Sequence, residues 1–472
     1  MTPLWTATDL TEATGGTMSR PFNATGVSID TRTLMPGDLF IALVGEGRDG
    51  HDFVLDALAK GAAGALVHRP VPGAGRTLLV DDTLAALARM GGFARSRFEG
   101  EVIAITGSVG KTTTKEMVRT ILSAFGPTHA AVASYNNHWG LPLTLARTQL
   151  DARFCVVEIG MNHPGEIAPL ARLARPHVAV ITSIEKAHVG HMGSIEAIAD
   201  EKAAILTGLE PEGVAVLPID NTLYPRLRVA AGAHRVVTFG AAQGATQGAD
   251  VRLTGLEQDA DGSLIEAEIA GRPIRFRLNA PGRHMAMNSL AVLAAASLVG
   301  ADLALSALAL SGFKPAAGRG VRHTLDLPGG HATLFDESYN ANPASMAAAL
   351  SVLGRSEIGP NGRRIAVLGD MLELGPSGPA LHRGLTDAIT AHNIDLVFCC
   401  GPLMHELWQA LPSTKRGGYA KSSAELESQI LGTIRAGDAI TVKGSLGSRM
   451  KLIVSALEKN FLSQSADGDL TV

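Results

Sequence analysis

TGSVGKTTTKE, residues 106–116, is the most informative part of this sequence. It follows the apolar run Val102–Ile105 and opens a segment with helical spacing. A buried strand, a glycine turn and a helix N-terminus together form a phosphate-binding loop, because free backbone N–H groups and the helix dipole attract anions. The stretch therefore predicts such a loop within an α/β domain.

Two glycines and a Lys-Thr pair supply the chemistry of this loop. Gly107 and Gly110 let the backbone approach phosphate oxygens, Lys111 adds a positive charge, and the Thr112 hydroxyl can bind Mg²⁺. The common pattern has another glycine five residues before Gly110, where this chain has Ile105. The loop is a shortened one, which counts against the ordinary GTPase and kinase families. A solvated turn that carries a lysine by chance is disfavoured by the strand context and by both glycines.

Bulk composition limits the class of protein. The 472 residues are 46% hydrophobic, enough for about three domains with their own cores. A near balance of 41 basic and 45 acidic residues argues against a nucleic-acid partner. Cys155, Cys399 and Cys400 lie in apolar runs and predict buried thiols in a reducing compartment. No secretory signal is evident, and the stretch 285–301 is too polar and too short to span a membrane. We expect a cytoplasmic protein without membrane insertion, and a monomer.

Apolar runs and glycines predict an α/β fold in three domains. Residues 1–82 read as a small α/β module, and residues 83–98 as a bridging helix that begins a central domain, 83–312. Strand-helix alternation predicts a mainly parallel central sheet, with an antiparallel excursion at 243–278. Residues 313–472 read as an open, Rossmann-like α/β domain after a Gly/Pro/Ala linker. In the central domain we expect strands near 102–106, 154–159, 178–184 and 214–217, and helices near 111–124, 194–207 and 284–310.

The short loop resembles the ATP loop of the Mur ligases and the folylpolyglutamate synthetases, which form amide bonds with ATP. Motifs similar to one branch of the Mur ligase family, the one that adds D-alanyl-D-alanine, recur in order along nearly the whole chain. They are SIDTR (28–32), GEGRDGHDF (45–53), NNHWGLPLT (136–144), VEIGMN (157–162), EKAHVGHMGS (185–194), DESYNANPASM (336–346), LGDMLELG (368–375) and VKGS (442–445). LGDMLELG and the SYNANP core are the most specific of these.

The chemistry of such a ligase explains Lys111 and Glu158. Joining a carboxylate to an amine requires activation of the carboxylate as an acyl phosphate, so positive charge must stand where two anions meet. Lys111 and Mg²⁺ can supply it. Glu158 ends the apolar strand pattern 154–157 beside the loop, where its oxygens would join Thr112 as Mg²⁺ ligands. A strand-end glutamate alone is structural about as often as functional, and the VEIGMN motif favours function.

Two further metal ligands are implied by resemblance only. His188, in preference to His191, matches a second Mg²⁺ site of the family. Lys202 aligns with a lysine that the family carries as a carbamate, which would make it an anionic oxygen ligand. The alternative for Lys202 is a surface lysine paired with Glu196 or Asp200 at helical spacing.

The resemblance also implies how ATP binds. The loop itself would hold the phosphates. Asn288 would contact adenine, while Arg319 and Asp336 would reach the ribose and phosphates from the third domain. The family often has asparagine where this chain has Met285, so the contact made there is in doubt. The implied ATP-binding residues are Gly107, Ser108, Val109, Gly110, Lys111, Thr112, Thr113, Asn288, Arg319 and Asp336.

Substrate-binding residues are implied in all three domains. The first domain would bind the UDP end of the substrate, the Asn-Asn pair would orient phosphate or substrate, and third-domain residues would hold the peptide or the incoming dipeptide. These residues are Thr31, Arg32, Asp49, Gly50, His51, Asn136, Asn137, Asn340, Asn342, Lys443 and Ser445. An Asn-Asn pair is also ordinary turn chemistry, and a capped loop is its alternative.

The resemblance implies an ATP-dependent ligase that joins D-alanyl-D-alanine to UDP-N-acetylmuramoyl-tripeptide and releases ADP and phosphate. One alternative is the sibling ligase that adds the third amino acid, although its DNPR motif is absent. A folylpolyglutamate synthetase would not need a UDP-binding first domain. A non-catalytic nucleotide switch would not need Lys111, Glu158, His188 and Lys202 together. The third residue of the tripeptide stays open.

Overall fold

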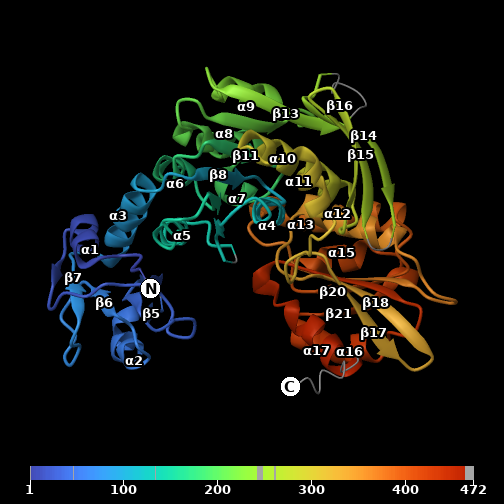
Figure 1. The fold of residues 1–472 in the computed structure, drawn as a ribbon. Coiled ribbons are helices and arrows are strands. Elements are labelled where there is room, and N and C mark those ends of the chain that lie inside the picture. Colours follow the sequence, from blue (N-terminus) through green and yellow to red (C-terminus); the bar gives the residue numbers. More distant parts are fainter. Residues whose placement is uncertain (1, 46, 133, 242–247, 260–261, 463–472) are drawn as a thin grey trace, which may run out of the picture.

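The structure, a computed structural model, describes residues 2–45, 47–132, 134–241, 248–259 and 262–462. Three α/β domains follow one another along the chain, each built on its own sheet. In Figure 1 the first domain (blue) and the third (orange to red) lie on opposite sides of the middle domain. The expected fold class is confirmed: a small first module, a mainly parallel middle sheet carrying the short loop, and an open third sheet.

Strand β8, Glu101–Thr106, is the apolar run that leads into the phosphate loop. Ile103 and Ile105 face one layer of helices, Val102 and Ala104 face the other, and all four side chains are fully buried. Helices therefore cover both faces of the middle sheet, as the continuous apolar run required.

The middle sheet is ordered β16-β15-β14-β13-β12-β11-β8-β10-β9. Its strands from β9 to β14 pair in parallel, and β14 to β16 form the expected antiparallel excursion. The strand bounds are β9 Thr128–Ala130, β10 Phe154–Glu158, β11 Val178–Ile181, β12 Val214–Pro218, β13 Arg235–Ala241, β14 Val251–Gln258, β15 Ser263–Ile269 and β16 Arg272–Leu278. The strands expected near 102, 154, 178 and 214 are confirmed. Strands β9 and β13 were not predicted from the sequence. Residues 242–247 and 260–261 of the expected excursion lie outside the described residues.

Helices of the middle domain form two layers. One layer contains α4 Lys111–Leu122, α10 Arg283–Leu298 and α11 Leu303–Leu310, and its apolar core includes the β14–β16 ribbon. The other contains α6 Ile167–Ala174 and α8 Ile195–Ala203, which continues as the 3₁₀ helix η2 Ala204–Gly208. The shorter helices are α5 Gly140–Ala146, α7 Val189–Met192 and α9 Tyr224–Ala230. The helical region expected near 284–310 is confirmed by α10 and α11, and no helix in the described ranges is long and apolar enough to cross a bilayer.

The first domain has a five-stranded sheet ordered β1-β7-β6-β3-β2, parallel except for β1. Its bounds are β1 Thr17–Met18, β2 Gly26–Ser28, β3 Asp38–Ile41, β6 Gly64–Val67 and β7 Thr77–Leu79, with a small hairpin of β4 Val44–Gly45 and β5 Arg48–Asp49. Its helices are α1 Ala7–Thr14, η1 Gly50–Phe53 and α2 Val54–Ala59. The expected bridging helix is α3 Thr83–Ser96, and its core cluster continues into α5 of the middle domain.

The third domain has a six-stranded sheet ordered β17-β18-β22-β19-β20-β21, parallel except for the β17–β18 hairpin. Its strands are β17 Val321–Leu327, β18 Gly330–Glu337, β19 Arg364–Gly369, β20 Leu396–Cys400, β21 Arg416–Ala420 and β22 Ala439–Lys443. Its helices are α12 Pro343–Arg355, η3 Gly375–Ser377, α13 Gly378–Arg383, α14 Leu385–Ala391, α15 Met404–Ala410, η4 Ser413–Lys415, α16 Ser423–Leu431, η5 Leu446–Ser448 and α17 Lys451–Phe461. Apolar clusters cover both faces of this sheet too.

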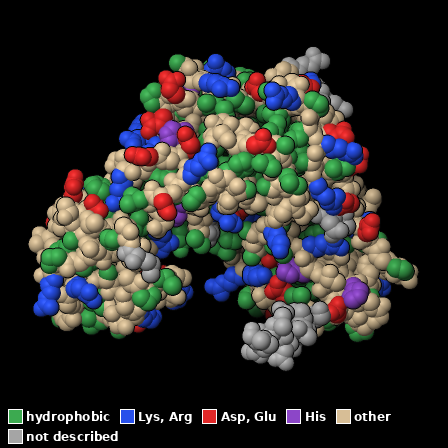
Figure 2. Space-filling model, viewed as in Figure 1, with side chains coloured by type: hydrophobic (Ala, Val, Ile, Leu, Met, Phe, Trp, Pro, Cys, Tyr) green, Lys and Arg blue, Asp and Glu red, His purple; other side chains and the backbone are tan. Residues whose placement is uncertain are grey.

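Carboxyl ends of parallel strands from two sheets meet at one cavity. Glu158 ends β10 in the middle sheet, while Glu337 and Lys443 end β18 and β22 in the third sheet, and all three line this cavity. Ligands of open α/β sheets bind beyond the carboxyl ends of the strands, so this is the expected place for a site. Figure 2 shows a separate, wide hollow below the middle domain, between the first domain and the third.

Candidate active site

The phosphate loop is held in shape by the end of the neighbouring strand β11. Thr182 Oγ1 donates to the carbonyl of Val109 at 2.5 Å, and the N–H of Ser108 donates to the carbonyl of Ser183 at 2.9 Å. Thr182 leaves no room for a side chain at Gly107, where a Cβ would lie 1.9 Å from the hydroxyl oxygen. The loop is therefore a preformed turn against a second strand end.

Gly110 is the residue from which α4 starts, and it needs to be glycine for two reasons. Its φ of 88° is in the left-handed region, which side chains rarely adopt. A Cβ there would also lie 2.5 Å from Nδ2 of Asn288 on α10. Asn288 is buried and lines the cavity beside the loop, where the sequence analysis expected it.

Lys111 is the first residue of α4, and its side chain folds back over the loop. Its Nζ donates to the carbonyl of Gly107 at 2.8 Å. Burial lowers the pKa of Lys111, Glu158 opposes that shift, and the positive charge of Arg319 adds to it. The Lys111 ammonium therefore lies at the loop near the negative charge of Glu158 and the positive charge of Arg319.

Glu158 is buried at the end of β10, and each of its carboxylate oxygens accepts a hydrogen bond. Thr112 Oγ1 donates to Glu158 Oε2 at 2.7 Å, and Asn136 Nδ2 donates to Glu158 Oε1 at 2.7 Å. Ser134 Oγ lies 3.2 Å from the Thr112 hydroxyl. The structure therefore brings Thr112, Glu158 and Asn136 into one hydrogen-bonded group beside the loop.

These oxygens fit Mg²⁺. The ion favours carboxylate and hydroxyl ligands, and proteins usually hold it by one or two such groups together with substrate phosphates and water. Thr112 and Glu158 offer both groups side by side. No group of three or more His, Cys, Asp or Glu side chains is arranged for a metal within the described part of the chain, so phosphate and water would complete the ligand set.

Arg319 crosses from the third domain to the middle domain. Its Nη2 donates to Ser134 Oγ at 2.9 Å, and its guanidinium lies 4.1 Å from the ring centre of Tyr339. Because Ser134 also contacts Thr112, the arginine is one side chain away from the loop. Arg319 and Tyr339 both line the cavity, whose volume is about 400 Å³.

Lys443 brings a second third-domain cation to this cavity. It is buried at the end of β22, where Nζ donates to Glu337 Oε2 at 3.2 Å and to the carbonyl of Asn340 at 2.9 Å. Asn340 and Asn342 line the same cavity, and both also line a smaller adjoining one of about 120 Å³ together with Ser445. The side chain of Asn342 caps α12.

His188 meets the third domain. Its Nδ1 lies 2.5 Å from Oε2 of Glu373, and both residues line the main cavity. Contact with His188 lowers the pKa of Glu373, burial opposes that shift, and His191 and His163 add to it. His191 stacks on His163 instead, with ring centres 4.8 Å apart.

Lys202 is enclosed within α8, with 1% of its surface exposed. Burial and the charge of Lys111 lower its pKa well below the ordinary value, and Glu201 opposes that shift. Within the described ranges its ammonium group makes no hydrogen bond or ion pair. The exposed lysine offered as an alternative is therefore wrong, since Asp200 pairs with Arg226.

Asp336 and Asn137 are occupied elsewhere. Asp336 is buried, and its carboxylate accepts from the N–H groups of Gly318 and Ser338 and pairs with Lys451. It therefore holds the linker that carries Arg319 and does not line the cavity. Asn137 Oδ1 accepts from the N–H of Gly140 at 2.9 Å at the start of α5.

First-domain candidates form two separate groups. Asp49 caps η1 and contacts His51 Nδ1 at 2.6 Å, while His51 Nε2 accepts from the N–H of His68 at 3.1 Å. The backbone of Gly50 packs against Leu43, where a Cβ would lie 2.7 Å from backbone atoms. Thr31 and Arg32 lie at another turn, and Arg32 pairs with Asp30 at 2.5 Å. Neither group lines the main cavity, so their proposed role in binding the UDP end stays a prediction.

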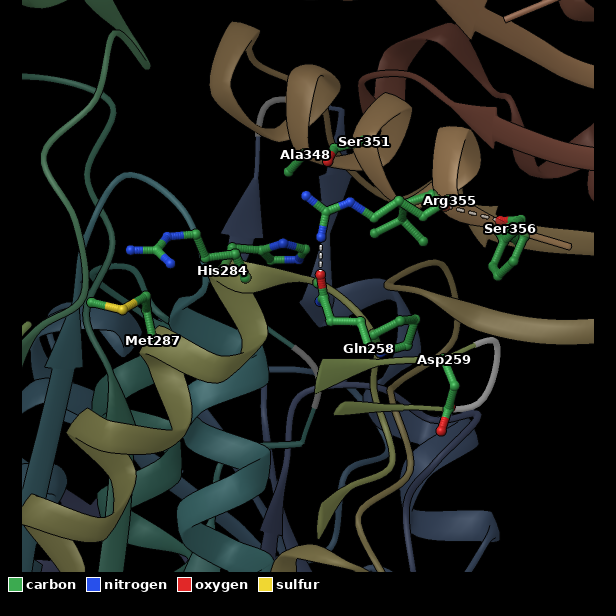
Figure 3. A pocket seen from close by; sticks show the side chains of 13 residues that line it. Gln258, Asp259, His284, Met287, Ala348, Ser351, Arg355 and Ser356 are labelled. Atoms are coloured by element: carbon green, nitrogen blue, oxygen red, sulfur yellow. Dashed lines mark hydrogen bonds between the residues drawn. The ribbon is translucent and has the colours of Figure 1, made fainter. Parts of the chain in front are cut away.

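A second cavity of about 350 Å³ lies between α12 and the end of β14. In Figure 3 the side chains of Arg355 and Gln258 point toward one another across it, and they are hydrogen-bonded. His284 lines this cavity and the main one, and burial lowers its pKa. The antiparallel ribbon thus reaches the third domain.

Several cavity residues were missed by the sequence analysis. Glu337 and Glu373 lie within quoted motifs, DESYNANPASM and LGDMLELG, and their charges could have drawn attention. Thr182 and Ser183 support the phosphate loop without lining the cavity, and they lie near the end of the strand expected at 178–184, so their position at the sheet edge could have been inferred. Ser134 carries no signal of its own.

Family models match most of the chain. The "Mur ligase family, catalytic domain" matches residues 23–87, the "Mur ligase middle domain" residues 105–296, and the "Mur ligase, glutamate ligase domain" residues 326–446.

Curated relatives match over nearly their whole length. A Synechocystis protein is 35% identical over 93% of both chains. An Escherichia coli protein is 34% identical over 92% of this chain and 94% of its own, and a Bacillus subtilis protein is 34% identical over 97% and 99%. All three are named UDP-N-acetylmuramoyl-tripeptide–D-alanyl-D-alanine ligase.

Solved structures similar to this chain come from the same group of enzymes as the curated relatives. MurF from Acinetobacter baumannii superposes with a TM-score of 0.85 at 31% identity, covering 97% of this chain and 99% of that one. MurF from Thermotoga maritima, solved in complex with ADP, has a TM-score of 0.76 at 25% identity over 92% and 97%. Since the relatives share about a third of their residues along nearly the full length, the chain belongs to the Mur ligase family.

Proposed function

We propose that this chain is an ATP-dependent ligase that joins D-alanyl-D-alanine to UDP-N-acetylmuramoyl-tripeptide, forming the pentapeptide precursor of peptidoglycan and releasing ADP and phosphate. The names of the curated relatives support it. The observation that carries it is the cavity where the carboxyl ends of two sheets meet, because it places a phosphate loop opposite cations from another domain.

The residues of the cavity divide the work of making an acyl phosphate. Lys111 and the N–H groups of the loop hold the phosphates of ATP, and Arg319 approaches them through Ser134. Two anions, the substrate carboxylate and the terminal phosphate, can then approach each other, because fixed positive charges offset their repulsion. The phosphoryl group passes to the carboxylate, the dipeptide amine attacks the carbonyl carbon, and phosphate leaves.

Thr112 and Glu158 would hold Mg²⁺ beside the loop. When bound, the ion neutralises phosphate charge and fixes the angle of attack. Asn136 keeps the Glu158 carboxylate in place through its amide, so this ligand needs no rearrangement before ATP binds. His188 faces the same cavity from α7 and is the candidate for a second ion.

Lys202 fits this second ion as a carbamate. A buried ammonium that lies close to Lys111 is poorly placed, whereas the lowered pKa of Lys202 favours the neutral amine. Only a neutral amine reacts with CO₂, giving a carbamate and a proton. The product would be an anionic oxygen ligand in place of a cation.

The other predicted residues complete the proposal. Asn340, Asn342, Lys443 and Ser445 would hold the incoming dipeptide or the peptide at the smaller cavity, while the first domain would bind the UDP end through Thr31, Arg32, Asp49, Gly50 and His51. In this proposal the first domain comprises residues 1–82, the middle domain residues 83–312 and the third domain residues 313–472. ATP and UDP-linked sugars are cytoplasmic metabolites, so we place the enzyme in the cytoplasm, acting as a monomer.

A substrate panel tests the proposed function. D-alanyl-D-alanine should stimulate ADP formation only when the UDP-muramoyl tripeptide is present, because the amine has no acyl phosphate to attack otherwise. Phosphate release and mass spectrometry of the product measure this. Turnover with diaminopimelate or lysine and the UDP-muramoyl dipeptide, and none with D-alanyl-D-alanine, would assign the chain to the sibling ligase.

A further inference from the structure

Two turns from different domains dock against each other at the edge of the cavity. We call them the junction: residues 188–190 of the middle domain and residues 373–375 of the third. The N–H of Gly190 donates to the carbonyl of Glu373 at 3.2 Å. A Cβ at Gly190 would lie 2.6 Å from the backbone nitrogen of Gly375, and a Cβ at Gly375 would lie 2.7 Å from Cα of Gly190. The two domains therefore touch backbone to backbone, which only glycine permits.

Strained backbone accompanies this contact on both sides. His188 has a φ of 58° and Glu373 a φ of 65°, in the left-handed region that such side chains rarely adopt. The two side chains meet, with Nδ1 of His188 at 2.5 Å from Oε2 of Glu373. Strain of this kind persists only where the surroundings impose it. Both turns therefore adopt strained conformations at the place where His188 and Glu373 meet.

Apolar packing joins the junction to both domains. Val189 packs against the core cluster of the middle domain that contains Val157 and Ile181. It also packs against the third-domain cluster that contains Met371 and Leu374. The position of the histidine is therefore tied to the position of the third domain.

The contact determines which nitrogen of His188 is available. Nδ1 is buried against Glu373 Oε2, in an ion-pair contact without hydrogen-bond geometry, so Nε2 is the nitrogen left to bind a metal. A carboxylate on the far nitrogen is the usual way in which proteins orient a metal-binding histidine, and its loss commonly costs about 10–100-fold in metal affinity.

We propose that Glu373 is a positioning residue that orients His188 for the metal across the domain junction, so that the second metal site is complete only when the third domain is docked. The inference rests on the proposed function. It adds a role for two residues of the LGDMLELG motif. Glu373 supplies the charge that contacts His188, and Gly375 lacks a side chain, which lets the two turns touch.

Metal binding tests the role of Glu373 without the ligation reaction. Mn²⁺ would be titrated by electron paramagnetic resonance into the full chain with a non-hydrolysable ATP analogue. Glu373→Ala should weaken one of two Mn²⁺ sites by about tenfold or more and leave the other unchanged. Glu373→Gln, whose amide oxygen can still accept a proton from Nδ1, should bind closer to wild type. Glu427→Gln, on α16, is the matched control.

Gly375→Ala tests docking separately. Its Cβ should hold the two turns apart and weaken the same Mn²⁺ site. Gly329→Ala is the control, because Gly329 also has a left-handed φ, 89°, in the third domain but has nothing within 4 Å of an added Cβ. Circular dichroism checks that each variant folds. If Gly375→Ala does not fold, Mn²⁺ binding by Glu373→Ala and Glu373→Gln alone tests the inference.

Three outcomes would overturn the inference: unchanged Mn²⁺ binding in Glu373→Ala, equal loss in the Ala and Gln variants, or equal behaviour of Gly375→Ala and Gly329→Ala. Failure of the proposed function is separate, because it would be seen in the wild-type chain as absence of the amide product. A wild type that makes the product while Glu373→Ala binds both ions normally refutes the inference alone.

Discussion

Single residues in the cavity are oriented before a ligand arrives. Glu158 accepts from Thr112 and Asn136, and Arg319 donates to Ser134, so the charged groups of the phosphate site already have fixed directions. Preorganised charge is more effective than charge that must reorient during the reaction. Lys202 is buried in α8 and does not line the cavity, and its ammonium has no hydrogen-bond or ion-pair partner within the described ranges.

Lys202→Ala should be nearly inactive, and added acetate or formate should restore part of its activity. A small carboxylate can enter the vacated space and replace the oxygens of the carbamate. Lys202→Arg should not be restored, because a fixed cation would remain near the metal. Phosphate release with and without carboxylate measures this, and full activity of Lys202→Ala would refute the carbamate.

At the scale of elements, the site depends on how the loop joins its strand and helix. β8 delivers the chain to the sheet edge, the loop turns over Thr182 of the next strand end, and α4 starts at Gly110. The first N–H groups of a helix have no helical partner, so this helix start beside the cavity is suited to bind an anion.

Gly110→Ala should weaken binding of an ATP analogue by about tenfold or more, which corresponds to about 1.4 kcal/mol. The added Cβ would meet Nδ2 of Asn288 at 2.5 Å in a left-handed backbone. Gly300→Ala is the matched control, since Gly300 has a φ of 83° with nothing within 4 Å. Calorimetric titration measures both, and equal affinities of the two variants would contradict the expectation that the loop cannot hold a side chain at Gly110.

His129, on the edge strand β9, should make the stability of the fold depend on pH. Burial lowers the pKa of His129 from 6.5 to about 4, Arg147 adds to this, and the Thr144 carbonyl opposes it. Between these two values the unfolded chain binds a proton that the folded chain does not, so stability is full above pH 6.5 and falls as the pH decreases toward 4.

Between pH 7 and pH 5, His129→Gln should therefore lose less unfolding free energy than wild type, by up to about 2 kcal/mol. Urea unfolding at the two pH values measures this. His331→Gln, with 70% of its side chain exposed in wild type, is the control. An identical pH dependence in wild type and His129→Gln would contradict the expectation.

At the scale of the whole molecule, the middle and third domains together line the cavity. The Arg319–Ser134 contact, the junction, and the Arg355–Gln258 bond in Figure 3 all cross between the middle and third domains. A water-excluding closure protects an acyl phosphate from hydrolysis.

Arg319→Ala should reduce turnover by roughly 100-fold while ATP-analogue affinity changes much less, because the third domain contributes its charge mainly during phosphoryl transfer. Ser134→Ala should be milder, and the double variant should be little worse than Arg319→Ala, since the two share one contact. Phosphate-release kinetics and titration measure these, with exposed Arg272→Ala as control. Additive losses would show that the two residues act separately.

Much of the fold follows from short stretches of neighbouring residues. TGSVGKTTTKE after an apolar run specified strand, loop and helix, because these depend on residues adjacent in the chain. Alternating apolar runs specified parallel sheets with two covered faces. The order of the motifs indicated the Mur ligases. The short edge strand β9 escaped, because its three residues are too few to show a period.

Which residues meet in the cavity depends on long-range packing. Ser134 stands between Thr112 and Arg319, Glu373 faces His188, and Asp336 supports the linker without reaching the cavity. These contacts join segments tens to hundreds of residues apart. Their distances depend on how the second and third sheets dock, and local patterns of polarity hold no information about that docking.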